Sequence, residues 1–215
     1  MTDSRPLPRG ARRLDATDVA RVAVVAAIVA VLGLPGGFSL FGAVPITAQT
    51  LGVMLAGALL GPWLGALSMA VLLALVAAGL PLLAGGRGGI GVFVGPSAGY
   101  LFGWIVGAFV IGLIVHWGGR KPVAWRTFTG VIVGGILVVY AIGIPVQSLV
   151  TRLPLAETAL SSLVFGPGDL VKAVIATAVV TTLVRAYPRA FRRTWATTPA
   201  TVAAGERDRD GAPVA

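Results

Sequence analysis

The chain has 215 residues, of which 56% are hydrophobic and 12% charged, whereas an ordinary soluble domain carries roughly 25% charged residues. This composition excludes a water-soluble monomer. The absence of cysteine excludes disulfides, thiol nucleophiles and thiolate metal sites. The only histidine is His116 and the acidic residues are scattered, so we expect no metal site, no cofactor and no enzyme activity.

The distribution of charge indicates a membrane protein with several spans. Only eight charged residues lie between Val22 and Val184, and the stretch of 65 residues from Val22 to Gly86 has none. A net charge of +9 would also suit a nucleic-acid-binding protein. The basic residues, however, gather at the two chain ends and in one central loop, where they flank apolar runs. We therefore expect no nucleic-acid partner and an all-α fold in a lipid bilayer.

Cutting the apolar runs at their proline and glycine residues predicts six transmembrane helices, each near the length that crosses a bilayer. In chain order, the predicted spans are Val19–Leu34, Ile46–Gly61, Trp63–Leu80, Ser97–His116, Phe128–Ile144, and a last span from just after Gly168 to Arg185. The first span follows a basic region but has no small-x-small cleavage site, so we interpret it as a permanent helix.

The predicted division of the chain is a cytoplasmic tail at residues 1–16, a six-helix substrate-binding domain at residues 17–187, and a second cytoplasmic tail at residues 188–215. Both tails are polar and contain proline and glycine, which is typical of disorder. With six spans, twelve basic residues near span ends lie on the side of the two termini, and only Arg87 and Arg152 lie on the other. The positive-inside rule then places both termini in the cytoplasm.

Two charged residues at membrane depth, Asp169 and Lys172, are the strongest functional candidates. They are three residues apart near the outer end of the sixth span, so they share one helix face. Lysine is rare in this chain, since the only other one is Lys121. The pair could be a self-neutralising ion pair, or an acceptor beside a donor for a small polar ligand that enters from outside.

A glycine-rich stretch from Gly85 to Gly91 lies on the same outer side and is closed by the segment Gly95–Tyr100. It could be a flexible linker. It could also let backbone near Gly86 approach a ligand, with Arg87 presenting a guanidinium to an anionic group.

Further polar residues would lie at the same depth. Pro45, Thr47, Gln49 and Thr50 start the second span, and Tyr140 lies near the outer end of the fifth. Each could have a structural role alone, but together with Asp169 they would converge near the outer leaflet.

No phosphate-binding loop of the form G-x-x-x-x-G-K-[ST] occurs, so we expect the energy for any transport to come from partner chains. Small residues at four-residue spacing would let helices approach closely. In the first span this stripe, which includes Ala23, Ala27 and Ala30, could serve packing or a partner subunit.

Five segments in order resemble the BioY family, the biotin-binding S components of energy-coupling factor (ECF) transporters. These segments are Val44–Pro62, Gly79–Pro81, Ala84–Gly89, Gly95–Tyr100 and Phe165–Ala173. The family usually has Gly-Pro-Thr-Gly-Gly-Tyr where this chain has Ser97 and Ala98, so the hydroxyl is kept but one glycine is lost.

The resemblance implies a six-helix fold in a bacterial plasma membrane, high-affinity capture of biotin from outside, and assembly with a T component and ATPase subunits. It also implies that Ala23, Ala27 and Ala30 face the T component. The alternatives are an S component for another vitamin, a solitary transporter or a membrane-embedded enzyme. The candidate substrate-binding residues are Asp169, Lys172, Gln49, Thr47, Gly86, Arg87, Ser97, Tyr100 and Tyr140.

Overall fold

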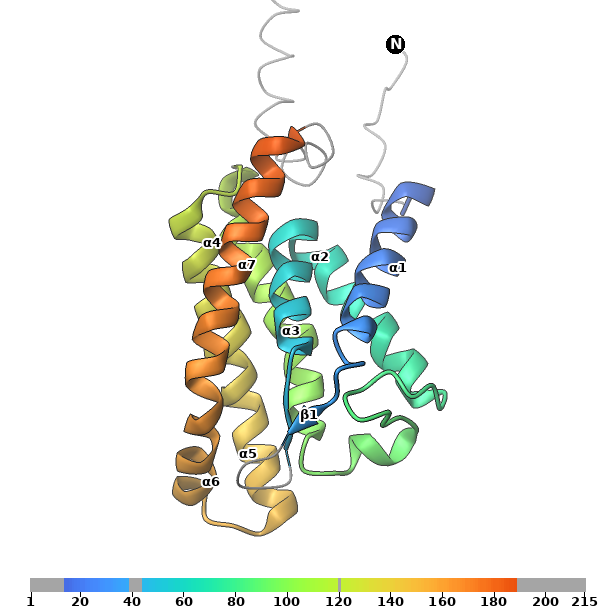
Figure 1. Cartoon of the computed structure of the whole chain (residues 1–215), viewed down its shortest axis with the longest axis vertical. Helices are drawn as coiled ribbons and strands as arrows, with labels where there is room; N and C mark the ends of the chain where they lie inside the picture. The colour runs from blue at the N-terminus through green and yellow to red at the C-terminus, as the bar shows by residue number, and fades with distance from the viewer. Residues whose placement is uncertain (1–13, 39–43, 120, 189–215) are drawn as a thin grey trace, which may run out of the picture.

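The computed structural model describes residues 14–38, 44–119 and 121–188, and these form an elongated bundle of helices (Figure 1). The predicted tails at residues 1–16 and 188–215 lie almost entirely outside the described residues. The described part is mostly helical, as predicted, with one short two-stranded ribbon.

The first helix, α1 (Ala16–Val31), begins after Asp15, whose carboxylate accepts a hydrogen bond from the backbone N–H of Asp18 at 2.8 Å. Strand β1 (Gly37–Phe38) then pairs antiparallel with β2 (Ile46–Thr47). The helix expected to begin near Ile46 begins at Gln49, because Ile46 and Thr47 belong to the strand. The Thr47 hydroxyl accepts a hydrogen bond from the Gln49 N–H at the start of the helix.

Helix α2 (Gln49–Ala77) doubles back on itself at Gly61, which has φ 80° and ψ −177°. A Cβ atom added at Gly65 would lie 2.9 Å from the Gly57 Cα, whereas a straight helix would hold these residues about 12 Å apart. The two halves of α2 are thus antiparallel and packed together. The break predicted at Gly61 and Pro62 is confirmed, because glycine tolerates this backbone conformation and proline suits the first turn of the helix that follows.

Helix α3 (Ala98–Val115) lies at the centre of the bundle and agrees with the span predicted at Ser97–His116. It follows a long loop that contains the short helix η1 (Ile90–Phe93). A Cβ atom at Gly107 would lie 2.6 Å from the backbone oxygen of Gly134, so the glycine stripe allows two helix backbones to touch. This confirms the predicted packing role of the stripe in α3.

The helical stretch after α3 is longer than predicted. A turn, η2 (Trp117–Gly119), is followed by α4 (Ala124–Gly130), a wide-turn segment η3 (Val131–Val138) and α5 (Val139–Thr151), which run on without a break. The prediction that this helix ends before Pro145 is wrong. Proline is tolerated inside membrane helices where neighbouring helices and local adjustments satisfy the freed backbone groups.

The chain then reverses into α6 (Leu155–Ser162), a short turn η4 (Leu163–Phe165) and α7 (Gly166–Ala186). Four stretches within the described residues are long and apolar enough to cross a membrane: Gln49–Ala77, Ala98–Val115, Ala124–Thr151 and Leu155–Ala186. Helix α7 exposes Leu170, Val171 and Val174, which is typical of a surface that contacts lipid.

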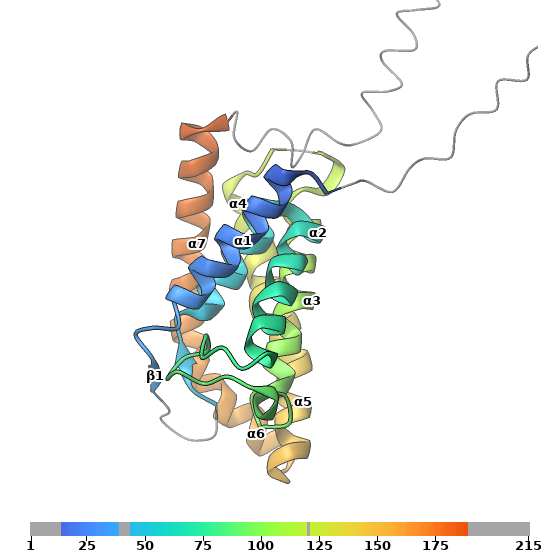
Figure 2. The ribbon, with the colours of Figure 1, turned by 90° about the vertical axis from the view of Figure 1, so that its right-hand side faces the viewer.

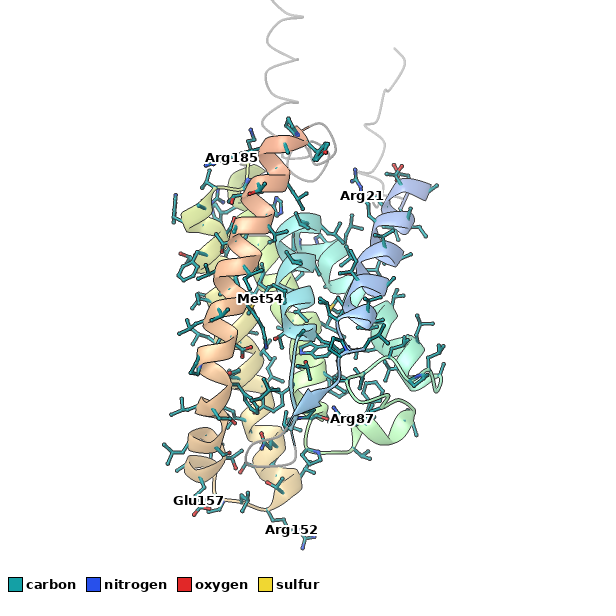
Figure 3. All side chains as sticks on the ribbon, viewed as in Figure 1. Arg21, Met54, Arg87, Arg152, Glu157 and Arg185 are labelled. Carbon is teal, nitrogen blue, oxygen red and sulfur yellow. The ribbon has the colours of Figure 1, made fainter. Side chains whose placement is uncertain are left out.

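The two ends of the bundle differ in charge and in chain position. The start of α1 and the end of α7 lie at one end, and α6 lies at the other (Figures 1 and 2). Arg21 and Arg185 mark the first end, whereas Arg152 and Glu157 mark the second (Figure 3). Arg87 lies toward the second end, so the glycine-rich loop and α6 are on the same side of the molecule.

Candidate functional site: a polar and aromatic pocket

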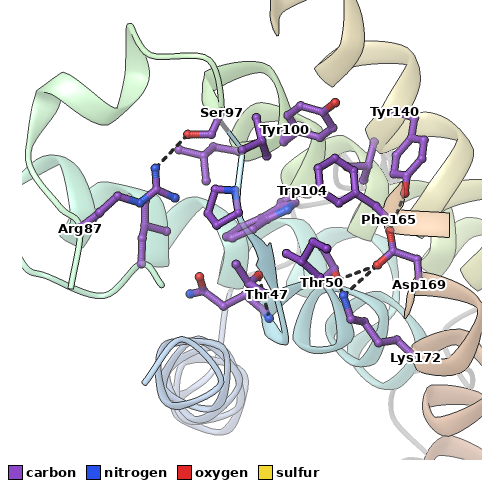
Figure 4. A pocket seen from close by; sticks show the side chains of 17 residues that line it. Thr47, Thr50, Arg87, Ser97, Tyr100, Trp104, Tyr140, Phe165, Asp169 and Lys172 are labelled. Carbon is purple, nitrogen blue, oxygen red and sulfur yellow. Dashed lines mark hydrogen bonds and ion pairs between the residues drawn. The ribbon is translucent and has the colours of Figure 1, made fainter. Parts of the chain in front are cut away.

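A pocket opens near the α6 end of the bundle, among residues from the β2 segment, the loop after α2, and helices α2, α3, α5 and α7 (Figure 4). Its empty volume, counted together with the open mouth, is about 590 Å³. Eight of the nine predicted site residues line it: Thr47, Gln49, Arg87, Ser97, Tyr100, Tyr140, Asp169 and Lys172. The convergence predicted for Thr47, Gln49, Tyr140, Asp169 and Lys172 is confirmed, whereas their role in binding a substrate stays a prediction.

Asp169 and Lys172 form an ion pair on the first turns of α7, with 2.9 Å between the Lys172 Nζ and the Asp169 Oδ1. The side chains are 5% and 16% exposed, respectively, so both charges are largely removed from water. A carboxylate in the first turn of a helix is also stabilised by the helix dipole. The shared helix face predicted from their spacing is confirmed.

Two hydroxyl groups from other helices complete a cluster around Asp169. The Thr50 hydroxyl of α2 accepts a hydrogen bond from Lys172 Nζ at 2.9 Å and donates one to Asp169 Oδ1 at 3.2 Å. The Tyr140 hydroxyl of α5 donates to Asp169 Oδ2 at 2.7 Å. We call Thr50, Tyr140, Asp169 and Lys172 the Asp169 cluster, and its members fix one another in place.

The Asp169 cluster keeps one donor and one acceptor for a ligand. An ammonium group has three N–H bonds, and two of those of Lys172 bind Asp169 and Thr50. Each carboxylate oxygen can accept about two hydrogen bonds, and Asp169 Oδ2 accepts only that of Tyr140 within the described residues. The cluster can therefore donate one hydrogen bond to a ligand carbonyl and accept one from a ligand N–H.

Arg87 and Ser97 line the other side of the pocket, next to the glycine-rich loop (Figure 4). Arg87 Nε donates to the Ala84 backbone oxygen at 3.3 Å, and Nη1 donates to the Ser97 hydroxyl at 3.4 Å. Partial burial lowers the pKa of the Arg87 guanidinium, but arginine stays protonated at physiological pH. The guanidinium thus offers further N–H groups to an anion in the geometry that suits a carboxylate.

Gly86 is the one predicted site residue that does not line the pocket. Its φ of +71° and the hydrogen bond from its N–H to the Leu83 oxygen at 3.0 Å close the turn that pairs Leu83 with Arg87. The prediction that its backbone approaches a ligand gains no support from this position. Gly86 instead shapes the turn that presents Arg87.

Gln49 and Thr47 line the pocket, but their hydrogen bonds go to the protein. The Gln49 amide nitrogen donates to the Val29 and Leu82 oxygens at 3.2 and 3.0 Å, and its oxygen accepts from the Ala84 N–H at 3.0 Å. Gln49 is 1% exposed and ties α1 and the glycine-rich loop to the start of α2. Its side chain therefore positions the pocket wall.

Three aromatic rings from different segments form the apolar part of the pocket. Tyr100, Tyr140 and Phe165 meet edge to face, with ring centroids 6.4 to 6.5 Å apart. The Tyr100 hydroxyl donates to the Gln147 side-chain oxygen at 2.8 Å and lies 3.1 Å from the Ser162 hydroxyl. These contacts connect α3, α5 and α6 beside the pocket.

Trp104 and Phe165 both line the pocket but are not among the site residues predicted from the sequence. Thr50 also lines it and is not among the predicted ligand-binding residues. Apolar and aromatic residues are abundant in membrane helices, so an aromatic residue there does not stand out as a candidate site residue. The spacing of Ser97, Tyr100 and Trp104 on one face of α3 is the signal that could have identified Trp104.

Comparisons with known proteins agree on one family. The model of the BioY family matches residues 6–189. The chain is 47% identical over 171 residues to the biotin transporter BioY of Rhodobacter capsulatus, covering 75% of this chain and 90% of the relative. It is 48% identical over 160 residues to the probable biotin transporter BioY of Bacillus subtilis, covering 74% and 86%.

A solved structure has the same fold. The crystal structure of an S-component for biotin from an ECF-type ABC transporter is 34% identical and superimposes with a TM-score of 0.75, covering 82% of this chain and 95% of that one. The match of the family model over most of the chain, together with these relatives, shows that the chain belongs to the BioY family.

Proposed function

We propose that this protein is the biotin-binding S component of an ECF transporter, which captures biotin with high affinity from outside the cell. The observation that carries the proposal is the pairing of one unused donor and one unused acceptor in the Asp169 cluster. A cyclic urea, the head group of biotin, has an N–H donor next to a carbonyl acceptor and matches this pair. The relatives named as biotin transporters support the same ligand.

The rest of the pocket suits the rest of biotin. The fused sulfur-containing ring and the aliphatic part of the tail are apolar, and Tyr100, Tyr140 and Phe165 offer aromatic surface to them. The carboxylate at the end of the tail needs a cation, which Arg87 supplies at the other side of the pocket. In this arrangement the urea binds at the Asp169 cluster and the carboxylate binds at Arg87.

The proposed topology has six membrane crossings, with both termini in the cytoplasm of a bacterial cell. The reversal at Gly61 supports counting α2 as two crossings, and α1 adds another to the remaining helical stretches. Arg21 and Arg185 lie at the end of the bundle where α1 starts and α7 ends, and basic residues at the cytoplasmic end are what the positive-inside rule favours. The pocket then faces the outer side of the plasma membrane.

The proposed partners are a T component and ATPase subunits, because the chain has no phosphate-binding loop with which to use ATP itself. Helix α1 supports a docking role, since Ala23 and Ala27 are exposed and Ala30 is half-buried. Small exposed residues let another membrane helix approach closely. Biotin uptake in cells that lack every ECF partner would contradict this assignment and indicate a solitary transporter.

A calorimetric titration of the detergent-purified protein with biotin tests the proposed ligand. We expect saturable binding at one site, without competition from excess riboflavin or thiamine. Binding of another vitamin in place of biotin would assign the protein to a different S component. Chemical turnover of a ligand without stable binding would indicate an enzyme.

A further inference from the structure

Trp104 carries a buried hydrogen-bond donor that the fold does not use. Its side chain lies on α3 within the pocket lining and is 5% exposed. The indole Nε1 is inaccessible to solvent and has no hydrogen-bond partner among the residues that the structure describes. A buried tryptophan N–H usually finds an acceptor, because leaving it unpaired costs free energy.

No hydrogen bond joins the Trp104 N–H to either tyrosine of the pocket within the described residues. The Tyr140 hydroxyl donates to Asp169, and the Tyr100 hydroxyl donates to Gln147. Figure 4 shows Trp104 between the Arg87 side of the pocket and the Asp169 cluster, with the nitrogen-bearing edge of the indole toward Phe165 and Asp169. A ligand in the pocket would supply the missing acceptor at the end where the Asp169 cluster lies, with a small shift of the side chains that cover the indole nitrogen.

We propose that Trp104 is a specificity-determining residue, whose indole N–H donates a hydrogen bond to the carbonyl oxygen of the bound cyclic urea. This inference rests on the proposed function. A urea oxygen accepts about two hydrogen bonds, and the free N–H of Lys172 and the N–H of Trp104 supply two donors. Asp169 then accepts from the ring N–H. Because an indole can only donate, this position selects ligands with an acceptor there.

The test removes the N–H of residue 104 in two ways. In one variant, Trp104→Phe, the indole is replaced by a smaller ring. In a second, Trp104 is replaced by benzothienylalanine through site-specific incorporation, which keeps the bicyclic shape but has sulfur where the N–H was. Each is titrated with biotin and with the biotin analogue whose ring C=O is changed to C=S, a weaker acceptor. Trp125→Phe is the matched control, because Trp125 is 70% exposed.

We expect both Trp104 variants to bind biotin about tenfold more weakly than the unaltered protein. We also expect the preference for the C=O ligand over the C=S ligand to shrink by a similar factor in both, with Trp125→Phe unchanged. Unchanged biotin affinity in the benzothienylalanine protein would overturn the inference, since it would show that only the shape of the ring matters. An unchanged C=O preference in both variants would also overturn it, because the acceptor would then be another atom.

Failure of this inference is distinguishable from failure of the proposed function. If the proposed function is wrong, the unaltered protein does not bind biotin. If only the assignment of Trp104 is wrong, the unaltered protein binds biotin, Asp169→Asn weakens the binding, and the benzothienylalanine protein binds as the unaltered protein does.

Discussion

The two ends of the pocket are built in different ways. At one end, the Asp169 cluster is held by side chains from three helices through hydrogen bonds of 2.7 to 3.2 Å. At the other end, Arg87 projects from a glycine-rich loop and makes hydrogen bonds of 3.3 and 3.4 Å. The helical end has more and shorter hydrogen bonds, so we expect it to be fixed before a ligand arrives and the loop end to adjust more readily.

This difference matches the two ends of the proposed ligand. A rigid bicyclic head needs donors and acceptors at fixed positions, and prearranged groups lower the entropic cost of binding. A flexible tail that ends in a carboxylate needs a cation with some freedom of position. We therefore expect substitutions in the Asp169 cluster to affect affinity more than substitutions at the loop end.

The largest effect is expected for Asp169→Asn, which should weaken biotin binding by at least about tenfold, or about 1.4 kcal/mol. The amide loses the charge, and it leaves Lys172 without a counterion in a largely buried position. Calorimetric titration of the purified variant measures the change. Glu157→Gln is the matched control, since Glu157 is an exposed acid at the same end of the bundle and should bind biotin normally. If Asp169→Asn and Glu157→Gln bind biotin with equal affinity, Asp169 does not take part in binding.

Lys172→Ala should also weaken binding by about tenfold or more, because the carboxylate of Asp169 loses its ion-pair partner and the ligand loses a donor. The other lysine, Lys121, is exposed, and Lys121→Ala provides the comparison. Affinity for biotin is measured as before. If Lys172→Ala binds biotin as tightly as Lys121→Ala does, Lys172 only neutralises the charge of Asp169 and does not contact the ligand.

Arg87→Gln should weaken biotin binding by a smaller factor, about fivefold, because the guanidinium is half-buried and competes with water for the carboxylate. The contribution of Arg87 should fall as ionic strength rises, so the difference between the variant and the unaltered protein should narrow in high salt. Arg152→Gln, an exposed arginine at the same end, should leave affinity unchanged. A loss larger than that of Asp169→Asn would reverse the comparison.

The smallest effects distinguish two hydroxyl groups. Thr50→Val removes a hydroxyl that bridges Lys172 and Asp169, and should weaken binding by about threefold. Ser97→Ala removes only a contact of 3.4 Å with Arg87 and should change affinity by less than about twofold. Both variants are titrated side by side. A larger loss for Ser97→Ala would show that the loop end is as tightly organised as the helical end.

The sequence predicts a helix well where glycine and proline residues flank it on both sides. Helix α3 lies between a Gly-Pro segment and a glycine pair, and its span agrees with the prediction. The reversal at Gly61 is predicted because Gly-Pro cannot continue a helix without distortion. Pro145 does not end the helix as the sequence predicts, since α5 stays helical on both sides of it within the bundle. The short helix α6 was not predicted, because its few residues have no membrane-length apolar run.

Site residues can be predicted from the sequence when their residue type is rare in membrane helices, and they cannot when it is common. Asp169 and Lys172 stand out because charge is scarce at membrane depth. Gln49 is also conspicuous, yet its bonds to Val29, Leu82 and Ala84 depend on loop positions that spacing does not reveal. Trp104 is one aromatic residue among many, and only the fold shows that its N–H is buried without a partner among the described residues.

The most direct test of the orientation of biotin compares two ligands on three proteins. Biotin and its neutral primary amide are titrated into the unaltered protein, Asp169→Asn and Arg87→Gln. We expect the unaltered protein to prefer biotin over the amide by about fivefold. Arg87→Gln should lose that preference, and Asp169→Asn should keep it while binding both ligands more weakly. Loss of the preference in Asp169→Asn, with the preference kept in Arg87→Gln, would contradict the assignment of the urea to the Asp169 cluster and of the carboxylate to Arg87.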